Sequence, residues 1–239
     1  MCYHVSTPAI LEIEKQFPDF SIEGDIQQYY HVSGFERPYL PVTTNAQPHL
    51  ITTARWKLIP HFVRTETAAK QYANTLNAHC GEIYNKTSYK PYIGKRHGLL
   101  YINGFYEPHI LDGQRQSVNY YIYGAQHEIM TLGIVYSTFR DEGTGTSYDT
   151  FSILTVDANE MMSEIYNEKL RMPLIVPAGD RMGWLNASAE DEVKSFFKPY
   201  QGELKAHQIA TRVTALRGVN TNVPEIQKAL PKENQSILF

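Results

Sequence analysis

Cys2 is the residue of this chain whose type and position carry the most chemistry, because it directly follows the initiator methionine. Removal of Met1 leaves its α-amine and its thiol on neighbouring carbons, with reference pKa values of about 7.7–8.0 and about 8.5. The amine can then form a Schiff base with an aldehyde, and the sulfur can close a thiazolidine ring on the same carbon. The alternative is structural, since free cysteine is among the most buried residue types and Cys2 can begin a strand that packs inward.

Glu107 is a candidate acid or base, because it ends the strand-like run Gly104–Glu107 and is followed at once by Pro108. Functional carboxylates often stand where a strand ends, and one beside an amine can assist Schiff-base formation by moving protons. The alternative is a surface glutamate in a turn, since glutamate is mostly an exposed residue.

Three other polar residues each have a functional and a structural interpretation. Asn77 stands at the end of a predicted helix, where asparagine tolerates the left-handed conformation and usually acts as a cap. Tyr166 and Arg171 bracket a polar loop ahead of the predicted strand Met172–Val176. The guanidinium fork of Arg171 can hold a phosphate, although a surface ion pair is the usual alternative.

Positive charge is concentrated in residues 54–96, which carry eight basic and two acidic side chains in a chain of formal net charge −3. Six aromatic side chains are interleaved, so this segment is a candidate surface for a polyanion with stackable bases. The alternative is a solvated face whose aromatics point into the core. The basic residues are Arg55, Lys57, Arg64, Lys70, Lys86, Lys90, Lys95 and Arg96, and the aromatics are Trp56, Phe62, Tyr72, Tyr84, Tyr89 and Tyr92.

Metal or cofactor chemistry finds little support in the sequence. Cys2, His4, His79 and Cys80 can in principle supply a Cys₂His₂ set, but neither pair has the spacing usual for zinc ligands. The sequence contains no Gly-rich phosphate loop and no G-x-S-x-G motif. We therefore predict no metal site and no cofactor.

The composition indicates a folded chain of 239 residues, with 42% hydrophobic and 20% charged residues. No apolar run approaches the roughly 18 residues of a membrane span, so no membrane association is expected. The N-terminal segment lacks a basic region followed by an apolar stretch, and Cys2 and Cys80 are the only cysteines. We therefore expect a cytoplasmic protein with two free thiols.

The apolar pattern predicts one α+β unit dominated by strands, without repeats or linkers. Many strands joined by turns favour a curved mixed or antiparallel sheet approaching a barrel, and Arg140–Ser147 is expected to form an exposed hairpin loop or a lid. The predicted strands are Cys2–Ser6, Tyr39–Thr43, Leu50–Ile59, Leu99–Tyr106, Ser117–Tyr123, Glu128–Thr138, Thr150–Val156, Pro173–Val176 and Ile209–Leu216. The predicted helices are Ile10–Phe17, Thr65–Asn77, Asp157–Tyr166, Ala189–Phe197 and Pro224–Leu230.

Seven segments, in the same order along the chain, resemble the motifs of the SOS response-associated peptidase family, also described as abasic-site processing proteins. Each motif alone is weak, but their order and spacing from residue 1 to about residue 225 are specific. The segments are Met1-Cys2, Trp56–Pro60 (family W-G-x-x-P), Leu76–Ala78 (N-A-R), Asn103–Glu107 (D-G-F-Y-E), Leu154–Asn159, Arg171–Leu174, and Thr211–Val213 with Gly218–Asn220.

The resemblance implies a single domain over residues 1–239, with a core to about residue 225, a tail at 226–239, a barrel-like β core and a basic groove. The implied partner is single-stranded DNA, or a junction of single and double strands, that carries an abasic site. After removal of Met1, Cys2 forms a thiazolidine with the ring-opened aldehyde, which crosslinks protein to DNA. Self-processing peptidase and lyase-like activities are also implied, and nothing in the sequence suggests an obligate oligomer.

The catalytic roles implied by the resemblance fall on four residues. Cys2 is the nucleophile, Asn77 positions the amine or the opened sugar, and Glu107 is the acid or base for ring opening, imine formation and reversal. Tyr166 stands where the family has a histidine that assists this glutamate. Histidine exchanges protons near neutral pH, whereas tyrosine stays protonated and mainly donates a hydrogen bond, so adduct formation or reversal is expected to be slowed but not abolished.

Two kinds of DNA contact are implied: aromatic walls that stack bases, worth about 1–3 kcal/mol per base, and polar contacts to the nucleotide backbone. Histidines occupy two positions where the family often has arginine, so phosphate binding is expected to be weaker and to depend more steeply on pH. Tyr3 and Lys57 stand where the family has glycine. The implied aromatic walls are Trp56 and Phe62, the implied backbone contacts are Thr155 and Arg171, and the two histidines at the arginine positions are His4 and His79.

Two alternatives to an abasic-site crosslinking enzyme stay open. One is a divergent member that binds DNA without reacting efficiently, because Tyr166 replaces the histidine. The other is an amide hydrolase in which Cys2 attacks with its own amine as base. The amide-hydrolase alternative gives the basic, aromatic segment of residues 54–96 no role in the reaction.

Overall fold

The centre of the fold is a closed barrel of five strands. The computed structural model describes residues 2–72, 75–111, 117–210, 213 and 219–231. Its strands are β4 (Tyr39–Thr44), β5 (Gln47–Trp56), β7 (His97–Ile102), β10 (Met130–Arg140) and β11 (Ser147–Asp157). Antiparallel pairs join them in the order β11-β10-β7-β4-β5, and a parallel pairing of β5 with β11 closes the ring. Valine, isoleucine, threonine and aromatic residues fill these strands and suit the pleated, buried surface.

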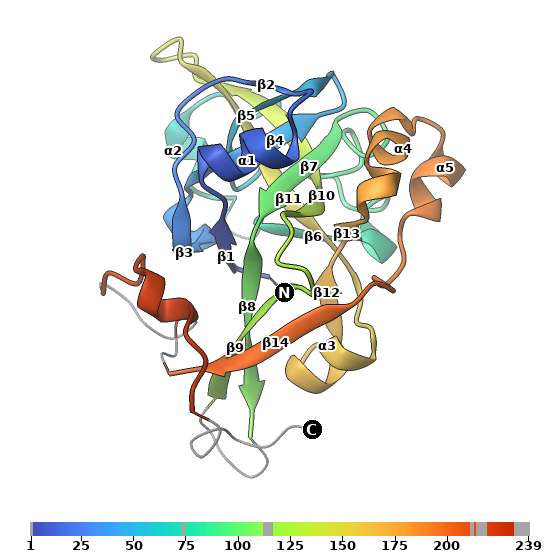
Figure 1. Ribbon diagram of the computed structural model, residues 1–239. Coiled ribbons are helices and arrows are strands. Elements are labelled where there is room, and N and C mark those ends of the chain that lie inside the picture. Colours follow the sequence, from blue (N-terminus) through green and yellow to red (C-terminus); the bar gives the residue numbers. More distant parts are fainter. Residues whose placement is uncertain (1, 73–74, 112–116, 211–212, 214–218, 232–239) are drawn as a thin grey trace.

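A second sheet continues from the barrel, because β8 follows β7 after the single residue Asn103 (Figure 1). Its strands, in spatial order, are β14 (Leu204–Ile209), β9 (Ser117–Gly124), β8 (Gly104–Ile110), β1 (His4–Thr7) and β3 (Tyr29–Ser33). In this sheet β1 is an interior strand, with Val5 opposite Phe105 on one side and opposite Val32 on the other. The residue that precedes β1 is therefore placed at the junction of sheet and barrel.

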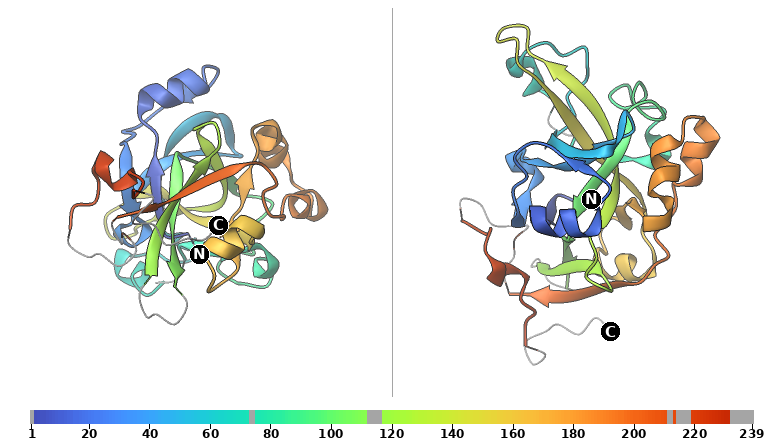
Figure 2. Two further views of the ribbon diagram at one scale, coloured as in Figure 1. Left: turned by 60° about the horizontal axis from the view of Figure 1, so that its bottom comes forward. Right: turned by 45° about the horizontal axis from the view of Figure 1, so that its top comes forward.

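Short strands and helices surround these two β units (Figure 2). The short strands are β2 (Ser21–Ile22), β6 (Asn77–His79), β12 (Arg171–Pro173) and β13 (Ile175–Val176). The α-helices are α1 (Ile10–Gln16), α2 (Glu66–Ala69), α3 (Glu160–Ile165), α4 (Arg181–Asn186) and α5 (Glu190–Ser195). Single 3₁₀ turns cover Gly34–Glu36, Cys80–Glu82, Ala178–Asp180 and Pro224–Gln227.

The predicted α+β class with a barrel-like core and peripheral helices is confirmed. Most predicted strands lie within a few residues of observed ones, and Arg140–Ser147 turns between β10 and β11 as a hairpin. The predicted run Leu99–Tyr106 is divided at Asn103 into two strands that belong to different sheets.

The helix predicted over Thr65–Asn77 is wrong. One helical turn, α2, forms where the Thr65 hydroxyl accepts from the backbone N–H of Ala68 at 3.2 Å. Asn77 does not cap a helix but begins β6, which pairs in parallel with β11. This pairing buries Ala78 beside the barrel and satisfies the backbone, which outweighs the local helix preference of the segment.

Two other element predictions need correction. The helix expected from Asp157 begins at Glu160, because the side chain of Asn159 accepts from the backbone N–H of Met162 at 2.9 Å. The strand expected over Ile209–Leu216 is instead β14, which ends at Ile209. Residues 211–212 and 214–218 lie outside the described residues, and with them most of the Thr211–Val213 motif.

The two β units share one hydrophobic core. Val5 and Phe105 from the second sheet belong to the same buried cluster as Leu100, Ile134 and Ile153 from the barrel. Because this core joins the units, residues carried by β1 and β8 keep a fixed position against those carried by β6 and β11. In the described part of the chain, no helix is both long and apolar enough to cross a membrane.

Candidate active site

Cys2 lies two residues before the first residue of β1, and its side chain is fully buried in the shared core. Its thiol faces the carbonyl oxygen of His4, with 3.8 Å between Sγ and O. Burial first, and the negative charge of Glu107 second, raise the pKa of the Cys2 thiol well above its ordinary value. The Cys2 thiol therefore packs inward, as the structural interpretation of this residue predicted, and it lies near the carboxyl group of Glu107.

Glu107 lies within β8 and does not end a strand, because β8 continues through Pro108 to Ile110. Proline fits there since β1 pairs with β8 at Gly104 and Phe105, ahead of this position. The Glu107 side chain is 2% exposed, and burial raises the pKa of its carboxyl group to about 7. The surface-turn interpretation is therefore wrong, and the carboxyl group is suited to proton transfer near neutral pH.

Phenol side chains border the carboxyl group of Glu107. Tyr120 of β9 lies directly opposite Glu107 in the strand register, and continuation of the β1–β8 register places Tyr3 on the other side. After burial, the charge of Glu107 is the next cause that raises the pKa of Tyr3 and of Tyr166. The structure therefore brings the predicted catalytic residues Cys2, Glu107 and Tyr166 into one electrostatic cluster.

Tyr166 directly follows α3 and is buried against this cluster. Its phenol stays protonated at neutral pH, because burial and the charge of Glu107 raise its pKa. Beside it lies His109, a residue that sequence reasoning missed, whose Nδ1 is 3.0 Å from the carbonyl oxygen of Glu164 and 3.1 Å from that of Ile165. The sequence did contain a signal for His109: it stands two residues after Glu107, and alternate residues of a strand share a face.

Asn77, His79, Thr155 and Arg171 come together at a pocket of about 440 Å³ or on the strands beside it. The parallel register puts His79 opposite Thr155, and the antiparallel register puts Asp157 opposite Arg171, so these side chains share one face of β6, β11 and β12. Lys86, Ser88, Tyr89 and the acidic Glu82 also line the pocket.

The pocket contains polar atoms that the described part of the chain leaves without a hydrogen-bond partner. They are both amide atoms of the Asn77 side chain, and the hydroxyl of Thr155, on the neighbouring strand β11, is also without a partner there. Buried polar groups of this kind usually have a partner, so unpaired ones aimed at a pocket indicate a polar ligand. His79 Nε2 lies 3.6 Å from Asp157 Oδ1, and burial followed by the charge of Arg171 lowers the pKa of His79.

Trp56 cannot stack a DNA base as it lies, so this prediction is wrong. Its ring is fully buried, stacks on Phe151 at 6.2 Å between centroids, and donates from Nε1 to the carbonyl oxygen of Leu76 at 2.9 Å. The apolar run that carries it belongs to the barrel strand β5, whose last residue packs inward. Phe62, in contrast, is 50% exposed, and its predicted stacking role stays a prediction.

His4 is also wrong as a phosphate contact. Its side chain is buried, and its Nδ1 lies 3.0 Å from Nε2 of His31, whose Nδ1 lies 2.6 Å from the hydroxyl of Thr221. Burial lowers the pKa of His4 to about 3, so the ring carries no charge for a phosphate. Among the described residues, no group of three His, Cys, Asp or Glu side chains could hold a metal ion.

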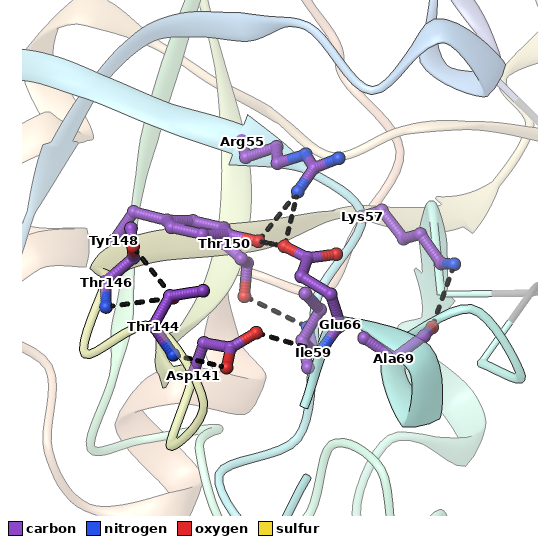
Figure 3. Close-up of polar contacts among 10 residues, drawn as sticks. All are labelled: Arg55, Lys57, Ile59, Glu66, Ala69, Asp141, Thr144, Thr146, Tyr148 and Thr150. Carbon is purple, nitrogen blue, oxygen red and sulfur yellow. Dashed lines mark hydrogen bonds and ion pairs between the residues drawn. The ribbon is translucent and has the colours of Figure 1, made fainter. Parts of the chain in front are cut away.

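The basic segment contains both exposed and structural cations. Arg55 donates to Glu66 at 3.1 Å and to the Tyr148 hydroxyl at 2.7 Å, and Asp141 accepts from the backbone N–H of Glu66 at 3.1 Å (Figure 3). These contacts fasten the β10–β11 hairpin to α2. Apart from Lys57, the other cations of the segment are exposed, and three of them have protein partners: Arg64 pairs with Glu142, Lys86 pairs with Glu82, and Arg96 donates to Thr138, while Lys70, Lys90 and Lys95 are exposed as well.

The backbone at Lys57 adopts a conformation that suits glycine, the residue that the family has at this position. Lys57 has φ of 123°, in the region that favours glycine, and its side chain is buried with Nζ 3.1 Å from the carbonyl oxygen of Ala69 (Figure 3). Lys57 is therefore not a surface cation of the basic segment but a tether for the end of α2.

The chain was compared with protein-family models, curated proteins and solved structures. A family model described as SOS response associated peptidase (SRAP) matches residues 1–216. The abasic site processing protein HMCES of Gallus gallus is 23% identical, over 92% of this chain and 72% of that protein. The HMCES protein of Mus musculus is 25% identical, over 80% of this chain and 62% of that protein.

Two solved structures share the architecture. A protein from Bacteroides thetaiotaomicron superposes with a TM-score of 0.84 and 28% identity, covering 96% of this chain and 100% of that one. A protein from Bordetella bronchiseptica superposes with a TM-score of 0.75 and 20% identity, covering 88% of this chain and 100% of that one, which shows a common fold alone.

Proposed function

The chain belongs to the SOS response-associated peptidase family, and from this premise we propose that it processes abasic sites in DNA by forming a covalent bond through Cys2. The observation that carries the proposal is the buried carboxyl group of Glu107 beside the Cys2 thiol. A carboxyl group with a pKa of about 7 is accessible in both protonation states near neutral pH, so it can serve as acid and as base in successive steps.

The proposed reaction begins once Met1 has been removed, either by the protein itself or by an aminopeptidase. An abasic sugar opens when a base takes the proton of its C1 hydroxyl, an acid protonates the ring oxygen, and the bond between C1 and that oxygen breaks. The amine of Cys2 adds to the aldehyde carbon, and loss of water leaves an imine. The thiol then adds to the imine carbon and its proton passes to the nitrogen, which closes the thiazolidine.

Glu107 supplies and removes the protons of these steps in the proposal, and Asn77 positions the amine or the opened sugar. The DNA strand would lie along the pocket of Asn77, His79 and Arg171, where unpaired polar atoms and positive charge meet. Single-stranded DNA, or its junction with a duplex, is the proposed partner, because stacking on Phe62 needs unpaired bases. Self-processing and lyase-like strand chemistry belong to the same proposal.

A non-reacting DNA-binding protein is the second candidate, favoured by two observations. The Cys2 thiol is fully buried with a raised pKa, and Tyr166 keeps its proton. Reaction therefore requires local opening at the start of β1, and a protein that never opens there would bind DNA without forming an adduct.

The test uses Met1-free protein and a single-stranded oligonucleotide with one abasic site, followed by a denaturing gel. The wild type and Cys80→Ala, which removes the other buried thiol, are expected to form a denaturant-stable adduct. Cys2→Ala is expected to bind the oligonucleotide without an adduct. Wild-type binding without adduct supports the second candidate, and hydrolysis of amide substrates without DNA binding supports an amide hydrolase.

A further inference from the structure

The buried position of Glu107 raises the question of how its proton reaches solvent. The side chain is 2% exposed, and each catalytic cycle of the proposed function requires Glu107 to gain and lose a proton. A buried acid can do this only through neighbouring groups or ordered water. Tyr166 cannot act as the accepting base near neutral pH, because its pKa is raised above the ordinary value for tyrosine.

His109 lies on the same face of β8 as Glu107, two residues further along and about 6.7 Å away by the rise of a strand. Carbonyl oxygens only accept hydrogen bonds, so the contacts of Nδ1 to Glu164 and Ile165 require the proton of neutral His109 to be on Nδ1. Nε2 is then the nitrogen with a lone pair. The α3 backbone thereby fixes one tautomer and leaves the other nitrogen free to take a proton.

Tyr120 connects the two residues in space. It lies opposite Glu107 in the β8–β9 register, and its ring meets the ring of His109 edge-on, with 6.2 Å between centroids. On the α3 side His109 contacts the backbone of Glu164 and Ile165, and the titratable residues of that segment are the exposed Glu164 and the buried Tyr166. Of this set, histidine is the side chain whose ordinary titration lies between pH 5 and 8.

We propose that His109 is the proton-exchange partner of Glu107, a positioning residue that acts through the carboxyl group and does not touch the DNA. When Glu107 takes a proton from the reacting sugar, that proton passes through bridging water to Nε2 of His109. Imidazolium then releases a proton to solvent and returns to the neutral tautomer. For ring-oxygen protonation the same path runs in reverse, so no proton is gained or lost overall. The proposal rests on the proposed function of Glu107.

The test compares adduct formation on abasic single-stranded DNA for the wild type, His109→Asn and His207→Gln. Asparagine keeps an N–H donor for the α3 carbonyls but does not titrate. His207 is the matched control, because it also contacts a backbone carbonyl, that of Gln227 at 2.7 Å, in the same sheet. Each variant is assayed with and without millimolar imidazole, and its affinity for an undamaged oligonucleotide is measured alongside.

We expect His109→Asn to form the adduct about tenfold more slowly at pH 7, less than the roughly 10²–10⁴-fold of a direct acid or base, because His109 acts through Glu107. Its DNA affinity should equal that of the wild type, and added imidazole should restore its rate in proportion to concentration while leaving the wild type unchanged. His207→Gln should behave as the wild type. A wild-type rate in His109→Asn, or a slow rate that imidazole does not restore, overturns the proton-exchange role. Absence of adduct from the wild type at every pH overturns the proposed function and this inference with it, so the two failures are distinguishable.

Discussion

At the scale of single residues, the most consequential feature is a carboxyl group held where its charged form is disfavoured. Burial raises the pKa of Glu107 from an ordinary 4.5 to about 7, so the folded protein holds a proton there that the unfolded chain releases. Between pH 4.5 and 7 the folded state binds more protons, and its stability falls as pH rises through that window.

Glu107→Gln should remove this pH-dependent cost. Relative to the wild type, the variant is expected to gain stability progressively from pH 4.5 to 8, by up to about 3 kcal/mol. Urea unfolding of both proteins across this pH range measures the difference. Glu164→Gln, which changes an exposed glutamate on α3, should show no such trend. A stability difference that does not vary with pH would contradict the raised pKa of Glu107.

Residue chemistry could be anticipated where type and position alone carried it. Cys2 and Glu107 were identified from the sequence, and the structure brings them together. Trp56 and His4 were misassigned because a sequence does not reveal which face of a strand packs inward, and Trp56 is fully buried although it stands between Arg55 and Lys57. His109 was missed because its value depends on the backbone of α3, a helix 55 residues away in the chain.

At the scale of elements, the tie between α2 and the end of β5 depends on Lys57. Its backbone φ of 123° is strained for any residue with a side chain. In this conformation its Nζ donates a hydrogen bond to the carbonyl oxygen of Ala69. Strain of this kind costs on the order of 1–3 kcal/mol, and the hydrogen bond returns about 1 kcal/mol.

Lys57→Gly and Lys57→Ala separate these two effects. Both variants lose the bond to Ala69, but only glycine relieves the backbone. Lys57→Gly is therefore expected to be more stable than Lys57→Ala by about 1 kcal/mol or more, measured by urea unfolding at one pH. Equal stability of the two variants would mean that the backbone at this position stores no strain.

The elements themselves were predictable to different degrees. The barrel strands carry their own signal, since β10 and β11 are long segments rich in β-branched and aromatic residues, which suit a buried pleated surface. The segment after α2 carries no such signal, and β6 exists because the edge of β11 offers backbone partners to Asn77 and Ala78. Pairings of that kind are properties of the assembled barrel and are not encoded within a short window of sequence.

At the scale of the whole molecule, the strands β6, β11 and β12 present one polar face to the proposed DNA strand. Arg171 is the arginine on that face that lines the pocket. For each phosphate contact, the affinity for a single strand falls by about 0.7 logarithmic units for every tenfold rise in salt concentration. Removal of one contact therefore changes the slope of log affinity against log salt by a measurable amount.

Arg171→Gln should weaken binding to undamaged single-stranded DNA and reduce the slope of log affinity against log salt by about 0.7. Fluorescence anisotropy at several salt concentrations measures both quantities. Lys15→Gln removes an exposed cation from α1 and should change neither. An unchanged slope in Arg171→Gln would place the DNA backbone elsewhere on the molecule. The single domain and monomeric state stay predictions.

The interior position of β1 has a consequence for the life of the newly made chain. Val5 pairs with Val32 on one side, but its partner on the other side, Phe105, is made a hundred residues later, so the strand after Cys2 becomes interior only then. At 5–20 residues per second, this leaves Cys2 as an unprotected aminothiol for about 5–20 s after it emerges, once Met1 is cut away. Small metabolic aldehydes can cap it in that interval without the local opening that the folded protein requires. The fraction of molecules with an uncapped Cys2 then depends on the rate of folding relative to the rate of reaction with aldehydes during synthesis. This fraction should fall in cells with a high aldehyde concentration.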